Sequence, residues 1–208
     1  MSARPPLRVG GLTPLTTIDY PGELAAVVYC QGCPWRCAYC HNGHLIPARA
    51  EASIPWDQVL CFLAARRGLL DAVVFSGGEP TLQSGLGRAM EDIRSLGFKV
   101  GLHTAGPYPE RLGRLLHRVD WVGLDIKGLP ETYPEVTGVA DSGERAWASL
   151  RLLLASGVAY EVRTTPMPGR QGAADLEVLS SRLAEAGVRR HRIQTCRTSQ
   201  VFDPARLA

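Results

Sequence analysis

The chain has 208 residues, of which 45% are hydrophobic and 21% are charged, and its formal net charge is +3. A chain of this length buries about 70% of its unfolded surface, and the composition excludes disordered, collagen-like and coiled-coil proteins. It contains no run of about 18 apolar residues that would span a membrane, and its scattered basic residues lack the basic stripe that nucleic-acid binding usually needs.

The amino terminus and the cysteines both bear on the cellular compartment. The first ten residues include Arg4 and Arg8 but no apolar stretch like that of a secretory signal, so we expect a cytoplasmic protein. Four of the six cysteines lie between residues 30 and 40. In a cytosolic protein, cysteines crowded in this way usually hold a metal or carry out redox chemistry.

Short apolar stretches alternate with longer amphipathic ones along the chain. The predicted elements are, in chain order, a strand at 23–29, a helix at 55–67, a strand at 71–76, a helix at 86–96, a strand at 98–104, a helix at 109–117, a strand at 121–126, a helix at 144–155, a strand at 159–165, a helix at 173–186 and a strand at 192–196. This alternation is typical of βαβ units and a parallel sheet. We therefore predict one α/β domain over residues 1–208, either an open doubly wound sheet or a partial barrel.

Polar or glycine-rich segments follow the first five predicted strands. In both architectures ligands bind at the carboxyl ends of the strands, so we expect these segments to meet at one mouth. They are residues 30–40, 76–80, 103–106, 125–127 and 163–166.

Cys33, Cys37 and Cys40 follow the spacing C-x3-C-x2-C. Thiolates hold iron–sulfur clusters, and three cysteines in one loop bind three irons and leave a fourth iron open for a small molecule. Zinc is the alternative, because Cys30 supplies a second C-x2-C pair and structural zinc takes four ligands. The spacing favours the cluster. Cys30, at a strand end, and Cys61, within a helix, are predicted to be core residues.

Gly77, Gly78 and Glu79 follow the second strand. Two glycines let the backbone approach a ligand closely or turn sharply, and the carboxylate accepts hydrogen bonds from a ligand ammonium. Such a turn is common after strands, so the motif alone is weak evidence of a site. Beside the cysteine loop it becomes a second point of contact for a ligand.

Asp125 and Lys127 lie two residues apart at the end of the fourth strand, so both point to the same side of the sheet. Opposite charges inside a barrel require a partner, and this pair is either structural or a site for a ligand carboxylate. Arg163 binds a ligand or neutralises Glu161. His103 fits a core or capping role as well as an active-site role.

Aromatic side chains surround the cysteines. Tyr39, between two of them, offers a flat face for a purine ring. Trp35 and His41 are also aromatic neighbours of the cysteines and are alternatives for this contact.

The three-cysteine spacing, with an aromatic residue before the last cysteine and Gly-Gly-Glu-Pro one βα unit later, resembles the radical S-adenosylmethionine (radical SAM) enzymes. The resemblance spans nearly the whole chain and implies a partial (β/α)6 TIM-type barrel of parallel strands. Residues 12–22 and 31–42 further resemble the glycyl-radical-enzyme activases. The closest resemblance is to the activating proteins of anaerobic ribonucleoside-triphosphate reductase, and the pyruvate formate-lyase activases are near relatives.

This resemblance implies an oxidoreductase with one [4Fe–4S] cluster per chain, held by Cys33, Cys37 and Cys40, whose open iron chelates S-adenosylmethionine. One electron from a reduced flavodoxin or ferredoxin cleaves the sulfonium to methionine and a 5′-deoxyadenosyl radical, which takes a hydrogen atom from a backbone glycine of a partner enzyme. The implied partner is a glycyl radical enzyme, with anaerobic ribonucleoside-triphosphate reductase favoured and neither nucleic acid nor membrane involved. The protein positions and tunes these cofactors, which carry the radical chemistry.

The resemblance also implies contacts with S-adenosylmethionine. Tyr39 borders the adenine, Thr104 lies on the ribose side, and the methionine amino end meets Gly77, Gly78 and Glu79.

At the ends of the next strands, Asp125 and Lys127 match the activases' D-x-K motif and Arg163 matches an arginine near the same site. Many activases carry Asp-Thr-Asn-Gly where this chain has residues 103–106, and the missing aspartate argues against a cation site shared with Asp125. Cys196 has no assigned role.

Two other functions remain compatible with the sequence. One is a radical enzyme that acts on a small molecule, such as a deazaguanine synthase, although the amino-terminal motif there differs from residues 18–22 of this chain. The other is a zinc-binding interaction protein without catalytic activity, which would contain one zinc and no acid-labile sulfide.

Overall fold

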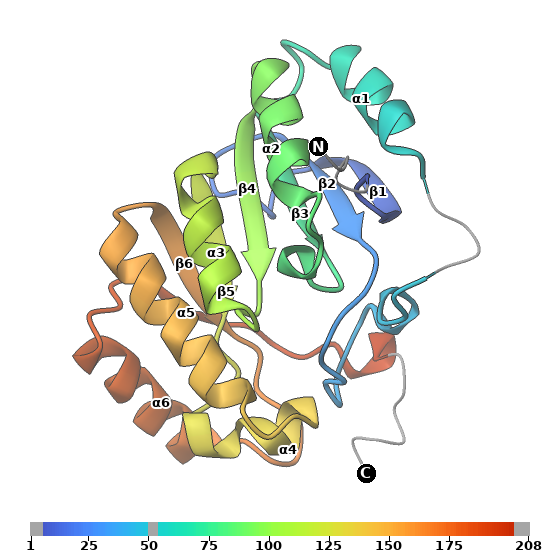
Figure 1. Cartoon of the computed structure of the whole chain (residues 1–208). Coiled ribbons are helices and arrows are strands. Elements are labelled where there is room, and N and C mark those ends of the chain that lie inside the picture. The colour runs from blue at the N-terminus through green and yellow to red at the C-terminus, as the bar shows by residue number, and fades with distance from the viewer. Residues whose placement is uncertain (1–5, 50–53, 202–208) are drawn as a thin grey trace.

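The computed structural model describes residues 6–49 and 54–201. Its strands form one seven-stranded sheet in which spatial order follows sequence order (Figure 1). A doubly wound sheet reverses its strand order at a switch point, so the unreversed order identifies the wall of a partial barrel. The strands that pair in parallel are β2 (Ala25–Cys30), β3 (Ala72–Gly77), β4 (Lys99–Thr104), β5 (Trp121–Asp125), β6 (Ala159–Thr164) and β7 (His191–Ile193).

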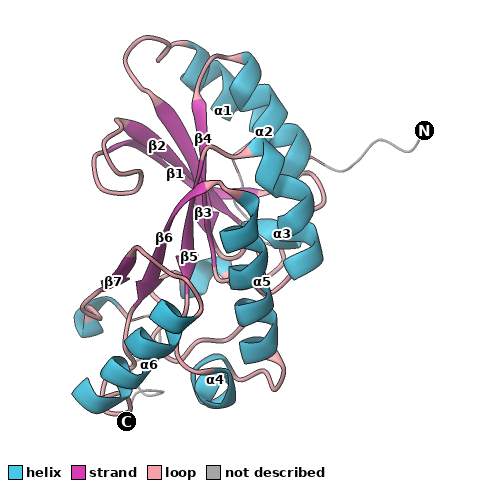
Figure 2. Ribbon diagram, turned by 90° about the vertical axis from the view of Figure 1, so that its left-hand side faces the viewer, coloured by secondary structure: helices cyan, strands magenta, loops and turns pink. Residues whose placement is uncertain are grey.

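The predicted strands and helices are confirmed, with small shifts at their ends. Figure 2 shows α1, α2, α3 and α5 covering one face of the sheet. No helix in the described part of the chain is long and apolar enough to cross a membrane. The α-helices are α1 (Trp56–Ala64), α2 (Leu86–Ser95), α3 (Pro109–Leu115), α4 (Tyr133–Thr137), α5 (Ser142–Ser156) and α6 (Ala173–Glu185). Short 3-10 helices are η1 (Gly43–Leu45), η2 (Pro80–Leu82), η3 (Leu116–Arg118), η4 (Pro130–Thr132) and η5 (Thr198–Gln200).

Among the strands and α-helices, two are not predicted from the sequence, β1 (Val9–Thr16) and α4. Strand β1 pairs antiparallel with β2, and its register shifts twice. It contains Gly10, Gly11 and Pro14, which break the apolar pattern of a strand, and the proline is tolerated because β1 lies at the sheet edge. Helix α4 has only five residues, too few to show a helical period. Because β1 pairs antiparallel with β2, the sheet is mostly parallel rather than wholly parallel.

The two faces of the sheet bury different side chains. Because side chains alternate along a strand, Val73 and Phe75 point toward the helices and join the main core. Val74 lies on the concave face, in a smaller cluster with Tyr20 and Trp121, whose ring centroids are 5.3 Å apart. This cluster fills the end of the barrel where the strands begin. The opposite end of the concave face carries the polar residues that end the strands.

Candidate active site

The cysteine loop leaves β2 and is fixed along its length by backbone hydrogen bonds. Gly32 N donates to the carbonyl of Leu45 over 2.7 Å, which closes the loop on its own continuation. In the middle of the loop, Ala38 N donates to the carbonyl of Val136 over 3.0 Å. Helix α4, which the sequence pattern does not predict, therefore holds the part of the loop between the last two predicted ligand cysteines.

The thiols of Cys33, Cys37 and Cys40 are partly buried on this loop. Burial raises the pKa of Cys33 to about 12, and the charges of Glu79, Cys37 and Cys40 act in the same direction. Burial also raises the pKa of Cys37, whereas the nearby Lys127 ammonium lowers it. The three thiols share one short loop, and the Lys127 cation favours the thiolate form of Cys37. Thiolates of this kind are the ligands that an iron–sulfur cluster uses. Within residues 6–49 and 54–201, no three His, Cys, Asp or Glu side chains converge as ligands of a single metal ion.

Two cysteines outside this set take different positions. Cys30 is fully buried in the main core, as predicted. Cys61 is exposed on α1, so its prediction as a core residue is wrong. The buried residues of α1 are Val59 and Leu63, four positions apart, and Cys61 lies midway between them on the opposite face of the helix.

The Gly77-Gly78 pair holds the end of β3 against the cysteine loop. Gly78 N donates to the carbonyl of Cys30 over 2.9 Å, and Glu79 N donates to that of Gly32 over 2.8 Å. A Cβ atom at Gly78 would lie 2.4 Å from the Gly32 oxygen, and one at Gly77, where φ is +112°, would lie 2.4 Å from Cys30 N. The close approach that requires glycine here is made by the protein's own backbone.

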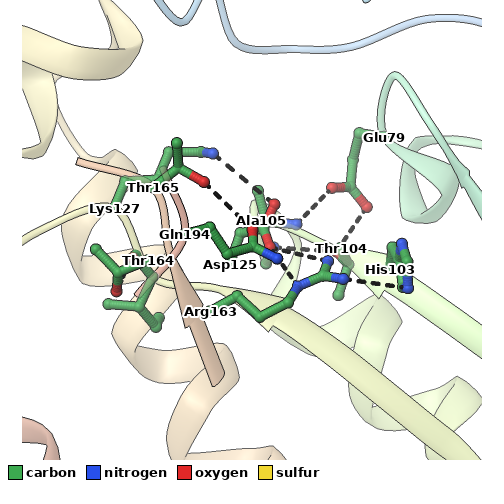
Figure 3. Close-up of polar contacts among 12 residues, drawn as sticks. Glu79, His103, Thr104, Ala105, Asp125, Lys127, Arg163, Thr164, Thr165 and Gln194 are labelled. Carbon is green, nitrogen blue, oxygen red and sulfur yellow. Dashed lines mark hydrogen bonds and ion pairs between the residues drawn. The ribbon is translucent and has the colours of Figure 1, made fainter. Parts of the chain in front are cut away.

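Glu79 is 1% exposed and its carboxylate accepts four hydrogen bonds. Figure 3 shows the two from Thr104 and Ala105. Oε1 accepts hydrogen bonds from Thr81 N, the Thr81 hydroxyl and the Thr104 hydroxyl, the last over 2.8 Å. Oε2 accepts one from Ala105 N over 3.0 Å. Burial raises the pKa of Glu79, and these hydrogen bonds lower it. The hydroxyl of Thr104, predicted to lie beside a ribose, is used here to hold Glu79.

Asp125 lies between two cations at the end of β5. The guanidinium of Arg163 contacts Oδ1 at 3.0 and 2.9 Å, and the ammonium of Lys127 lies 4.0 Å from Oδ2. Burial acts to raise the pKa of Asp125, but Arg163 and Lys127 lower it below its usual range. Among the described residues Arg163 pairs with this aspartate, so the alternative pairing with Glu161 is not formed.

His103 joins the β1–β2 connection to this charged group. Its Nε2 lies 2.7 Å from the carbonyl oxygen of Asp19 and 3.2 Å from an Arg163 nitrogen. A carbonyl only accepts, so Nε2 carries the proton and donates to Asp19. Burial and then the Arg163 charge lower the pKa of His103 to about 4, so the ring is neutral near pH 7. The structure therefore gives His103 a role in tying two segments together.

Lys127 is fixed through its backbone by two residues that the sequence does not single out. Lys127 N donates to the hydroxyl of Tyr133, and Gln171 Nε2 donates to the Lys127 carbonyl, each over 2.8 Å. Its side chain is 12% exposed. Burial lowers the pKa of Lys127, but Tyr39, Cys37 and Asp125 raise it well above its usual value, so the ammonium is charged. No local sequence signal marks Tyr133 or Gln171 for this task, since their contacts arise from folding.

The aromatic neighbours of the cysteines differ in burial. Trp35 is buried and packs edge-on against Tyr133, with ring centroids 5.9 Å apart. Tyr39 is 5% exposed, and its hydroxyl has no hydrogen-bond partner among the described residues. His41 Nε2 lies 4.0 Å from the sulfur of Cys196.

Residues 27–180 match the Radical SAM superfamily. The chain is 29% identical to a candidate glycyl-radical enzyme activating enzyme of Methanocaldococcus jannaschii, over 94% of this chain and 82% of that one. It is 32% identical to the pyruvate formate-lyase-activating enzyme of Clostridium pasteurianum, over 65% of this chain and 59% of that one. SuiB of Streptococcus suis, solved with S-adenosylmethionine bound, shares the fold with a TM-score of 0.65 at 17% identity, over 82% of this chain and 40% of that one. Because the family match runs from β2 into α6, this chain belongs to the radical SAM superfamily, whose members use a [4Fe–4S] cluster and S-adenosylmethionine.

Proposed function

We propose that this protein is a glycyl-radical-enzyme activase, which removes a hydrogen atom from a backbone glycine of a partner enzyme. The observation that carries the proposal is the similarity to an activating enzyme over 94% of the chain. The pyruvate formate-lyase-activating enzyme supports the same class, although this chain spans only 59% of its length. The described fold supplies the rest of the support, since three thiols, a buried carboxylate and two cations meet at one end of the barrel.

Each group at this end has a role in the proposal. Cys33, Cys37 and Cys40 hold the cluster, and Oε2 of Glu79, which has one protein donor, accepts a hydrogen bond from the methionine amino group. The Lys127 ammonium binds the methionine carboxylate. When bound, the reduced cluster and S-adenosylmethionine supply a one-electron cleavage that yields methionine and, after the hydrogen atom is taken from glycine, 5′-deoxyadenosine.

The open side of the barrel supports a macromolecular substrate. Strand β1 pairs with β2 and β7 pairs with β6, so among the described strands the sheet does not close between its first and last members. A glycine within a loop of a folded partner needs such lateral access to reach a buried site. A small-molecule substrate does not require it.

For the partner itself, we propose anaerobic ribonucleoside-triphosphate reductase, on the basis of the sequence motifs in residues 12–22 and 31–42. Pyruvate formate-lyase is the second candidate, because one of its activating enzymes is 32% identical to this chain. We further propose a cytoplasmic location and a flavodoxin or ferredoxin as electron donor.

The test is anaerobic incubation of the cluster-loaded protein with S-adenosylmethionine, dithionite and either candidate partner from the same genome. We expect the electron paramagnetic resonance doublet of a glycyl radical on the reductase, and no doublet when the partner's radical-bearing glycine is replaced by alanine. A doublet on pyruvate formate-lyase alone would change the partner and keep the activase. Cleavage of S-adenosylmethionine with no protein radical on either partner would contradict the activase function.

A further inference from the structure

The hydroxyl of Tyr39 is the one buried side-chain polar atom in the described part of the chain without a hydrogen-bond partner. Tyr39 is 5% exposed, so bulk water does not replace that partner. A buried donor left unpaired is destabilising, and a phenylalanine would fill the same space without that cost. The unpaired hydroxyl therefore points to a partner that is supplied by a bound molecule.

The surroundings of the ring limit what Tyr39 can contact. One face lies below the Lys127 ammonium, 5.5 Å from the ring centroid. The ring is otherwise packed in an apolar cluster that includes Ala38, Val136 and Met167. The ring therefore meets apolar side chains and one cation. These contacts leave the hydroxyl without a hydrogen-bond partner.

The charged neighbours of this hydroxyl indicate the chemistry of its partner. The Lys127 ammonium lies over the Tyr39 ring and 4.0 Å from Asp125, so Tyr39 lies at the end of the barrel where the strands end. A tyrosine hydroxyl is able to donate a hydrogen bond. The Lys127 ammonium is a second donor, and its ion pair with Asp125 is long at 4.0 Å, beyond direct hydrogen bonding. Two donors at one place, one of them a cation, suit an anionic acceptor.

We propose that the Tyr39 hydroxyl donates a hydrogen bond to the amino-acid carboxylate of S-adenosylmethionine, and that Tyr39 and Lys127 bind this carboxylate together. Figure 3 shows Lys127 reaching toward Asp125 from the loop after β5. Tyr39 approaches from the cysteine loop, so the carboxylate lies where these two loops meet. The assignment depends on the cofactor of the superfamily and not on which glycyl radical enzyme is the partner.

The first test compares wild type and Tyr39→Phe as cluster-loaded full chains. Without S-adenosylmethionine, the variant should melt at the same temperature as wild type or higher, because it loses an unpaired hydroxyl. Its affinity for S-adenosylmethionine should fall about tenfold, the usual effect of one hydrogen bond to a charged group. Isothermal titration calorimetry and thermal unfolding measure the two effects. Tyr133→Phe is the matched control: its hydroxyl accepts from Lys127 N, so this variant should melt at a lower temperature.

The second test asks whether the hydroxyl contacts the carboxylate. Decarboxylated S-adenosylmethionine keeps the sulfonium, ribose and adenine, so its affinity should be the same for wild type and Tyr39→Phe. An equal loss for both ligands would overturn the carboxylate assignment. The proposal is also overturned by unchanged affinity for S-adenosylmethionine, by a lower melting temperature of ligand-free Tyr39→Phe, or by loss of iron from that variant. The last two results would show a structural hydroxyl.

Discussion

At the scale of single residues, polar side chains at the barrel mouth already form hydrogen bonds with other groups of the protein. Thr104 shows this most clearly, since its hydroxyl donates to Glu79 and accepts a hydrogen bond from Gly106 N over 3.0 Å. Both partners are buried with it. Loss of this hydroxyl should therefore lower the free energy of unfolding, because it removes one hydrogen bond from buried Glu79 and one from Gly106 N.

We expect Thr104→Val to lower the free energy of unfolding by about 2–4 kcal/mol, because it leaves a buried carboxylate oxygen and an amide less satisfied. Thr104→Ser keeps the hydroxyl and loses only a methyl group, so its cost should be about 1 kcal/mol. Urea unfolding of the metal-free full chain, followed by circular dichroism, gives both values. A serine variant as unstable as the valine variant would show that the methyl group, and not the hydroxyl, matters.

The cysteines give a second prediction at this scale. Cys30→Ala should keep about four irons and four sulfides per chain, because Cys30 lies in the core and the proposed cluster ligands are Cys33, Cys37 and Cys40. Cys33→Ala should lose the cluster under the same reconstitution. Iron and acid-labile sulfide analysis distinguishes them. Loss of iron from Cys30→Ala would mean that the wrong three cysteines have been assigned, and one zinc without sulfide would revive the zinc-binding alternative.

At the scale of elements, the cysteine loop is a joint product of segments far apart in the chain. It is bonded to β3 through Gly78 and Glu79 and to α4 through Val136. A single added methyl group at Gly78 meets the Gly32 oxygen, which belongs to the loop backbone and cannot move alone.

Gly78→Ala should therefore lower the free energy of unfolding by roughly 3 kcal/mol, since the overlap must be relieved by shifting backbone. The same shift should reduce the iron bound per chain. Gly113→Ala in α3 is the control, because its nearest contact is 3.7 Å away and alanine favours a helix interior by about 1 kcal/mol. Urea unfolding and iron analysis should separate the two variants. A Gly78→Ala chain with wild-type stability and iron would show that the loop adapts.

The strands and helices differ in how well the sequence predicts them. Hydrophobic period and glycine helix ends predict β2 to β7 and the five longer helices, because those signals are local. Strand β1 and α4 lack such signals, as the first is interrupted by Gly10, Gly11 and Pro14 and the second is one short turn. Their positions depend on tertiary contacts, such as the pairing of β1 with β2.

The same division applies to the site. The residue types at the strand ends could be predicted, since parallel strands deliver their carboxyl ends to one mouth. The contacts between these residues could not be predicted. Arg163 pairs with Asp125 and not with Glu161, and Gln171 bonds to the backbone of Lys127, 44 residues away in sequence. Those contacts follow from barrel register and loop packing, and the roles of the site residues toward the cofactor stay predictions.

At the scale of the whole molecule, His103 makes stability depend on pH. Its pKa is about 4 in the folded chain against an ordinary value of 6.5. Between these values the unfolded chain binds the extra proton, so stability falls as pH falls from 6.5 toward 4. We expect a loss of up to about 2 kcal/mol between pH 7.5 and pH 5.

His103→Gln should flatten this part of the profile, which isolates His103 from other groups that titrate in the same range. Urea unfolding of both chains at several pH values from 7.5 to 5 measures the difference. Parallel profiles for the two proteins would show that folding does not lower the pKa of His103 and would contradict its burial as a neutral ring.

We expect this barrel to cleave S-adenosylmethionine reductively at a cluster held by Cys33, Cys37 and Cys40. The most direct measurement is 5′-deoxyadenosine, quantified by liquid chromatography after anaerobic reconstitution with iron and sulfide and reduction by dithionite in the presence of S-adenosylmethionine. We expect 5′-deoxyadenosine and methionine in equal amounts from wild type and neither from Cys33→Ala. A wild-type chain with a full cluster that yields no 5′-deoxyadenosine, with or without either candidate partner, would contradict it.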